Sequence, residues 1–186
     1  LFQKNLNSWE MILQTEATAV DLGLQRPSHE SSVTQTNIDI PLDTFVGRES
    51  EMKTIRSTLN EGKRLITLLG AGGSAKTRLA LQFGAQFVDE FQGGVWFCDL
   101  SEARNEQDVV AAIARGLSLE LSGGDRSMQV GRSILGRESV LLVVDNAEQV
   151  AKTASKLLQK WVNMAPSAAF LVTSRARLQI PGEIVV

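Results

Sequence analysis

The sequence predicts an α/β fold in which helices cover both faces of an open, five-stranded parallel sheet. From Leu65 onward, short apolar runs alternate with amphipathic stretches, and a glycine-rich loop follows the first run. Strands that are buried on both faces are continuous apolar runs, and parallel neighbours need helical crossovers, so this alternation favours a doubly covered parallel sheet. The length of 186 residues, of which 43% are hydrophobic, is enough for one sizeable core.

We expect residues 1–41 to form an N-terminal helix and a linker, and residues 42–186 to form the main domain. Residues 25–42 are polar, rich in Ser and Thr, and have a proline near each end, which is typical of a linker. The preceding helix is predicted by a patchy helical spacing of Leu6, Trp9, Ile12, Leu13, Val20 and Leu24.

In the main domain the first expected element is a helix after Arg48. It is predicted by Met52, Ile55 and Leu59, which recur at intervals of three and four, and the glycine at 62 ends it. The expected strands cover residues 65–69, 95–98, 140–144, 170–173 and 183–186. The stripes that predict the helices between them are Leu79, Phe83, Phe87 and Phe91; Val109, Ile113 and Leu117; and Leu157, Leu158, Trp161 and Val162.

Composition excludes several classes of protein. A net charge of −2 and a pI of about 5.5 disfavour direct binding of nucleic acid. The single cysteine, Cys98, excludes a disulfide framework and a cysteine-rich zinc site. No apolar run approaches the roughly 20 residues of a membrane span, and the N-terminus lacks a signal peptide, so we expect a cytoplasmic protein. The chain starts with leucine instead of methionine, so we expect it to be a piece of a longer protein.

The strongest motif is GAGGSAKT at residues 70–77, between an apolar run and a helical stripe. It matches the phosphate-binding pattern GxxxxGK[ST] except at Ala75. Loop N–H groups and the following helix N-terminus suit phosphate oxygens, while Lys76 would reach the β and γ phosphates and Thr77 would bind Mg²⁺. The alternative is a flexible glycine turn. The predicted nucleotide contacts here are Gly70, Gly72, Gly73, Ser74, Ala75, Lys76, Thr77 and Arg78.

Ala75 leaves a second alternative open. A methyl group at this position crowds the phosphates or resists the backbone angles that glycine accepts, which would give a degenerate loop that binds nucleotide poorly. Some P-loop ATPases that resemble the partition-protein class have alanine at the same place, in KGGVAKT, so the loop tolerates it. That class also has a second lysine where this chain has Ala71, and we do not assign the chain to it.

Asp145 ends the apolar run VLLVV, so a carboxylate lies at the edge of the sheet where α/β proteins bind ligands. We expect it to bind Mg²⁺ together with Thr77; alone, such an aspartate is more often a turn or helix cap. Many hydrolysing P-loop proteins place a second acid next, but here the residue is Asn146. Glu148 is then a candidate water-orienting base, or an acid that favours the dipole of the next helix. Hydrolysis is expected to be slow at most.

Two more segments bring candidate residues. Arg175 follows the run FLVTS, where its guanidinium is placed to approach a γ-phosphate; a solvated or salt-bridged surface arginine is the alternative. The segment FVGRE at 45–49 precedes the first helix and by itself predicts only an entry turn with a capping glutamate. We therefore place possible catalytic roles at Lys76, Arg175 and Glu148.

In this order, FVGRE, GAGGSAKTRLA, LLVVDNAEQV and LVTSRARLQIPGE resemble motifs of the STAND class of P-loop ATPases. The likeness is greatest to the nucleotide-binding domains of LuxR-type and AfsR-type bacterial regulators, relatives of NB-ARC domains, and it covers roughly residues 42–186. It implies nucleotide contacts from Val46 and Arg48, a γ-phosphate sensor at Arg175, and a sheet order of 5-1-4-3-2. Asn146 is typical of the LuxR-like branch.

The resemblance implies a switch that binds ATP or ADP with Mg²⁺, in which ADP holds a closed form and ATP opens it. Its partners would be the nucleotide, adjoining effector and sensor domains, and further copies in a nucleotide-dependent assembly, without a membrane or direct nucleic-acid contact by this piece. The helical lid, winged helix and repeat sensor of the class are not in this sequence. The rival functions are a nucleotide-independent scaffold with a disabled loop and an efficient motor or transport ATPase.

Overall fold

The computed structural model describes residues 36–38 and 47–186. These belong to the unit that spans Thr34–Val186. The helix expected within residues 1–24, the predicted domain start near residue 42 and Val46 lie outside the described residues, so they stay predictions.

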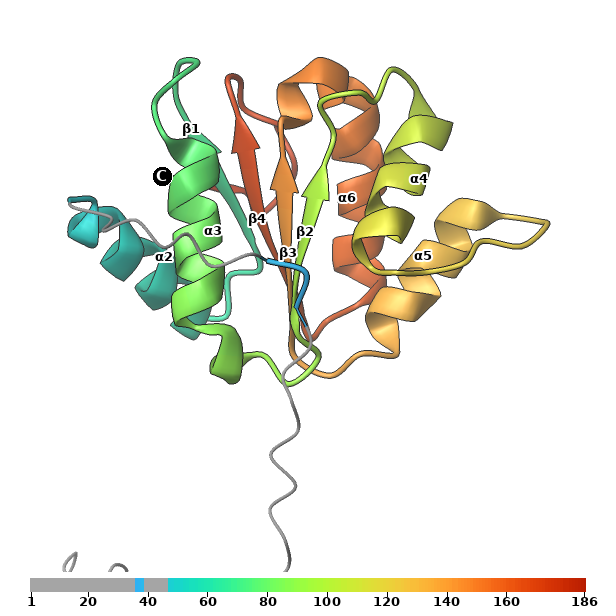
Figure 1. The fold of residues 1–186 in the computed structure, drawn as a ribbon, viewed down its shortest axis with the longest axis horizontal. Coiled ribbons are helices and arrows are strands. Elements are labelled where there is room, and N and C mark those ends of the chain that lie inside the picture. The colour runs from blue at the N-terminus through green and yellow to red at the C-terminus, as the bar shows by residue number, and fades with distance from the viewer. Residues whose placement is uncertain (1–35, 39–46) are drawn as a thin grey trace, which may run out of the picture. The chain divides into compact units, whose positions relative to one another are not determined.

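A five-stranded, fully parallel sheet forms the centre of the fold (Figure 1). Its order is β2-β3-β4-β1-β5, which is the predicted 5-1-4-3-2 read from the other edge. Both the α/β fold class and the strand order are therefore confirmed. The strands are β1 (Leu65–Leu69), β2 (Val95–Asp99), β3 (Val140–Asp145), β4 (Ala168–Ser174) and β5 (Ile184–Val185).

Helices cover both faces of the sheet and make it three-layered (Figure 1). One face is covered by α2 (Glu49–Asn60) and α3 (Lys76–Gln86), and the other by α4 (Glu106–Gly116), α5 (Arg126–Leu135) and α6 (Ala151–Met164). Alternate strand residues point to opposite faces. Phe170 of β4 accordingly packs in the core beneath α4, α5 and α6, while Leu171 packs beneath α2 and α3. No helix in the described ranges has the length and apolarity needed to cross a membrane.

Two expectations about the helices need correction. The stripe Leu79–Phe91 predicts one long helix, but α3 ends at Gln86 and a 3-10 turn covers Val88–Glu90. Helix α5 was not expected at all, because Val130 and Ile134 are its only buried aliphatic residues and Gly131 lowers its helix propensity. The packing explains that glycine, since a Cβ there would lie 2.7 Å from Cε of Met164 on α6.

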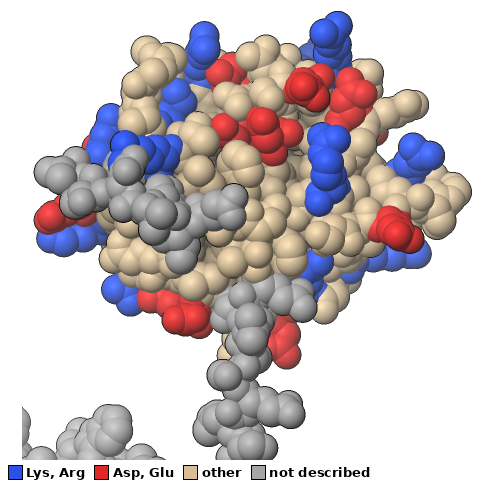
Figure 2. All heavy atoms as spheres, in the orientation of Figure 1, with Lys and Arg blue, Asp and Glu red and all other residues tan. Residues whose placement is uncertain are grey.

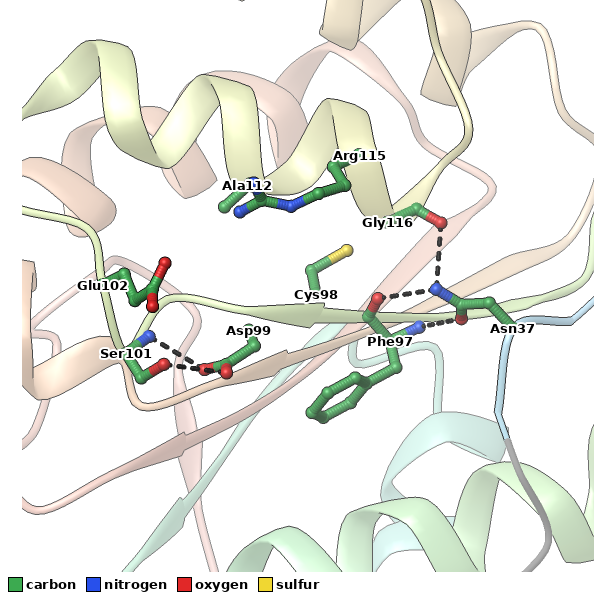
Figure 3. Close-up of a pocket in the computed structure, with 9 residues that line it drawn as sticks. All are labelled: Asn37, Phe97, Cys98, Asp99, Ser101, Glu102, Ala112, Arg115 and Gly116. Carbon is green, nitrogen blue, oxygen red and sulfur yellow. Dashed lines mark hydrogen bonds between the residues drawn. The ribbon is translucent and has the colours of Figure 1, made fainter.

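Residues 36–38, which the sequence assigns to the linker, lie along the free edge of β2. Thr36 forms a parallel bridge with Val95, and Ile38 is buried in the core beneath α3, where a Cβ on Gly84 would touch it. The side chain of Asn37 accepts a hydrogen bond from the amide of Phe97 at 2.7 Å and donates to the carbonyl oxygen of the same residue at 3.0 Å. The side-chain amide of Asn37 thus takes the place of a backbone amide at the edge of β2 (Figure 3).

Candidate nucleotide-binding site

The candidate site lies where β1, β3 and β4 end. Residues 70–75 connect β1 to α3, and the amide of Gly70 donates to the carbonyl oxygen of Ser174, the last residue of β4, at 3.3 Å. This edge of an open parallel sheet is the usual place for a ligand. Figure 2 shows basic and acidic side chains interspersed along the upper rim, where the strands end. Recognition of an anion here would therefore depend on specific contacts more than on a broad positive field.

The loop holds two residues in the left-handed region that favours glycine. Gly73 has a φ of 77°, and Ala75 has a φ of 58° and a ψ of 25° in the left-handed region. The methyl group of Ala75 therefore does not keep the chain out of the conformation that glycine favours, although it costs about 1–2 kcal/mol there. Ala75 gives α3 no side-chain cap, and the first turn of α3 carries no acidic residue. The positive end of the helix is consequently left for an anion.

Lys76, the first residue of α3, folds back into the loop. Its ammonium donates to the carbonyl oxygens of Gly70 at 2.8 Å and Ala71 at 2.9 Å, and it lies 3.3 Å from Oγ of Ser74. Gly70 leaves room for this arrangement, because a Cβ there would lie 2.8 Å from Oγ of Ser74 and the hydroxyl would have to move. The loop thus concentrates one full positive charge next to its exposed backbone.

Thr77 and Asp145 meet at the bottom of the site. The hydroxyl of Thr77 donates to Oδ1 of Asp145 at 2.7 Å, and the hydroxyl of Thr173 donates to the same oxygen. Asp145 is only 4% exposed, so these bonds fix its carboxylate. Mg²⁺ prefers oxygen ligands and is usually held by one or two carboxylates together with phosphates and water. The carboxylate of Asp145 and the hydroxyl of Thr77 are therefore oxygen ligands that would suit a magnesium ion.

Asn146 connects this carboxylate to β2. Its backbone φ is 59°, and its side-chain amide donates to Oδ2 of Asp145 at 2.9 Å and to Oδ1 of Asp99 at 3.1 Å. Burial raises the pKa of Asp99, but hydrogen bonds from Ser101 and Asn146 and the charge of Arg115 outweigh it and hold the pKa below its ordinary value. Asp99 also borders a cavity of about 390 Å³ between β2 and α4 (Figure 3).

Asp99 and Thr173 belong to this network without a role predicted from the sequence. The signal that could have found them is the position of each at the end of a predicted strand, as for Asp145. Carboxyl ends of parallel strands meet at one edge, so polar residues there converge.

Arg175 and Glu148 form an ion pair beside the glycine-rich loop. Nε of Arg175 lies 3.0 Å from Oε1 of Glu148, and a Cβ added to Gly72 would lie 3.1 Å from Nη2 of Arg175. The structure therefore brings the predicted sensor arginine against the glycine loop. It also pairs the candidate base with that arginine.

The remaining predicted contacts come from either side of the loop. Nη2 of Arg48 donates to the carbonyl oxygen of Ser74 at 3.0 Å, while Nη1 pairs with Glu51 at 3.1 Å. Arg48 thus supports the loop from the start of α2. Arg78 is exposed in the first turn of α3.

Comparisons with known proteins agree with the fold. A family model described as "AAA domain" matches residues 58–179. An uncharacterised protein of Mycobacterium tuberculosis is 33% identical over 143 residues, which are 77% of this chain and 36% of that protein. A putative HTH-type transcriptional regulator of the same organism is 34% identical over 121 residues, 65% of this chain and 14% of the regulator. The chain thus spans about a third of the length of the first relative.

A solved structure shows the same fold. The crystal structure of Cdc6p from Pyrobaculum aerophilum superposes with a TM-score of 0.57 at 18% identity, over 79% of this chain and 43% of that one. At this identity the likeness concerns the arrangement of the sheet and helices.

Proposed function

We propose that this chain, which belongs to the AAA domain family, is a magnesium-dependent switch domain. It would bind ATP and ADP and hydrolyse ATP slowly at most. This family fits the STAND-class resemblance of the four motifs. The observation that carries the proposal is the loop itself, where Ala75 is left-handed, Lys76 lies inside, and Thr77 bonds to Asp145. These are the groups that polyphosphate and its magnesium ion require.

The proposed roles follow from the contacts. Backbone amides of Gly72, Gly73 and Ser74 would cradle the phosphates, and Lys76 would exchange its bonds to loop carbonyls for bonds to the β and γ phosphates. Thr77 and Asp145 would hold Mg²⁺, which when bound neutralises phosphate charge. Arg175, beside Gly72, would reach the γ-phosphate. Val46 and Arg48 remain proposed contacts to the nucleotide.

Two features favour slow turnover. The residue after Asp145 is Asn146, whose amide donates to two carboxylates and cannot take a proton from water. Glu148, the next carboxylate along the chain, is paired with Nε of Arg175. A long-lived bound state suits a switch, because partners then have time to respond to it.

The proposed setting is a larger cytoplasmic regulator. The chain covers a minority of the length of both mycobacterial relatives, one of which is named as a putative HTH-type transcriptional regulator. Adjoining effector and sensor domains and a nucleotide-dependent self-association are the partners that we propose for this domain.

Calorimetric titration and thermal unfolding with MgADP and MgATP test the proposal. Ligand at a hundredfold excess over its Kd should stabilise the fold by about 2.7 kcal/mol, a rise of about 5–10 °C in Tm for a domain of this size. Lys76→Ala should lose most of this rise, while Lys156→Ala, exposed on α6 on the other face of the sheet, should keep it. Equal binding by Lys76→Ala and the parent chain would contradict the proposal.

One observation favours a second function. The ammonium of Lys76 already has acceptors on its own loop, and Ala75 is held in a costly conformation. A loop closed on itself would serve as a nucleotide-independent scaffold for neighbouring domains. Absence of any Tm rise with either nucleotide would favour the scaffold, whereas rapid phosphate release that disappears in Glu148→Gln would favour an efficient hydrolase.

A further inference from the structure

The ion pair between Glu148 and Arg175 restrains the side chain of Arg175, which is largely exposed to solvent. The side chain of Arg175 is 62% exposed, whereas that of Glu148 is 15% exposed. Oε2 of Glu148 is buried and has no hydrogen-bond partner among the described residues. The carboxylate therefore depends on Arg175 for its compensation, because a buried, unpaired carboxylate is costly. This dependence holds the arginine in place despite its exposure.

The pair also decides which edge of the guanidinium faces the loop. Nε is the nitrogen next to Glu148, at 3.0 Å, while Nη2 is the atom nearest to a Cβ built on Gly72. A guanidinium is a planar fork, so one edge can serve a carboxylate while the terminal nitrogens serve phosphate oxygens. The glycine at 72 leaves the room that this approach needs.

We propose that Glu148 is a positioning residue that aims Arg175 at the γ-phosphate and so sets the preference for a nucleoside triphosphate over a diphosphate. The inference rests on the proposed function and deepens it. An Arg–Glu pair has no net charge, so it adds little general attraction for polyphosphate. Its effect is to order the guanidinium before the ligand arrives, which removes an ordering cost from triphosphate binding alone.

The test is calorimetry on the 186-residue chain with MgADP and with the magnesium complex of a non-hydrolysable ATP analogue. The measured quantity is the ratio of the Kd for the diphosphate to the Kd for the analogue. Glu148→Gln should lower this ratio by about tenfold, in line with the loss of one charge-assisted contact. Arg175→Lys should lower it similarly, because one ammonium cannot bond like a fork to both partners. In the double variant Glu148→Gln should have no further effect.

Glu90→Gln is the matched control. Like Glu148, Glu90 forms an ion pair with an arginine, because its Oε1 lies 2.6 Å from Nη2 of Arg56. Removing the charge of Glu90 should leave the ratio unchanged. If Glu148→Gln does not fold, as judged by circular dichroism, Glu148→Asp, which keeps the charge but shortens the reach to Nε of Arg175, takes its place and should also lower the ratio.

Four results would overturn the inference. An unchanged ratio in Glu148→Gln, with MgADP still bound by the parent, refutes positioning while the proposed function stands. An equal loss of affinity for both nucleotides indicates a structural role, and a loss of hydrolysis with the ratio intact indicates a base. If the parent chain binds neither nucleotide, the proposed function fails first and the inference fails with it.

Discussion

Replacing Ala75 with glycine separates the backbone strain of the glycine-rich loop from its proposed ability to bind phosphate. Ala75 has a φ of 58°, where a residue with a Cβ costs about 1–2 kcal/mol. Glycine removes this cost but loses about 0.4–1 kcal/mol through the greater freedom of the unfolded chain. We therefore expect Ala75→Gly to raise the free energy of unfolding, by up to about 1.5 kcal/mol. Urea unfolding followed by circular dichroism measures this change.

The same variant tells whether the methyl group obstructs the phosphates. The backbone at 75 is already left-handed, so glycine should leave the loop amides where they are and change the Kd for MgADP by less than about threefold, under 1 kcal/mol. Ala111→Gly, at an exposed position inside α4, is the control of opposite sign and should lose about 1 kcal/mol. The reasoning is refuted if Ala75→Gly destabilises the fold, or if it tightens binding tenfold without a gain in stability.

Three further predictions concern β2 and its surroundings. Asn37→Ala removes bonds to Phe97 and to the carbonyl oxygen of Gly116 and should cost about 1–3 kcal/mol in urea unfolding; a change below 0.3 kcal/mol, roughly the additivity error of such comparisons, would show that the edge is not held there. The pKa of Asp99 is lowered in the fold, so its stabilisation is complete above the unfolded pKa of about 3.9 and is lost as the pH falls through the folded pKa. The stability difference between the parent and Asp99→Asn should accordingly shrink in acid, and a difference independent of pH would contradict this. Burial raises the pKa of Cys98 to about 12, so the thiol should react with a disulfide reagent at pH 8 only after unfolding; rapid labelling of the native chain would be the contrary result.

The sheet could be predicted from the sequence because its strands are buried on both faces. The runs LITLL and VLLVV are continuous for that reason. Helix α5 and residues 36–38 could not be predicted in the same way. In α5 the buried stripe includes a serine and a glycine, and the pairing of Asn37 with β2 depends on a side chain 60 residues away from its partner.

In the candidate site, too, the residues with a local sequence pattern could be predicted, and the contacts that depend on the tertiary structure could not. The loop and Asp145 have local patterns, in which a strand leads directly to glycines or to a carboxylate. The pairing of Arg175 with Glu148 has no such pattern, because the two residues follow different strands and meet only when β3 and β4 lie side by side. Asp99 likewise joins the network through the register that places it opposite Asp145.

That register gives a physical reason for Asn146. Asp99 and Asp145 end neighbouring strands, so two carboxylates face the same edge of the sheet. A second acid at position 146 would add a third negative charge between them, and like charges at this distance raise one another's pKa. The amide of Asn146 instead donates to both carboxylates, to Asp99 at 3.1 Å and to Asp145 at 2.9 Å, and so orients the carboxylate of Asp145. Under the proposed function, an amide that orients Asp145 takes the place of a water-orienting acid, and this would suit slow hydrolysis.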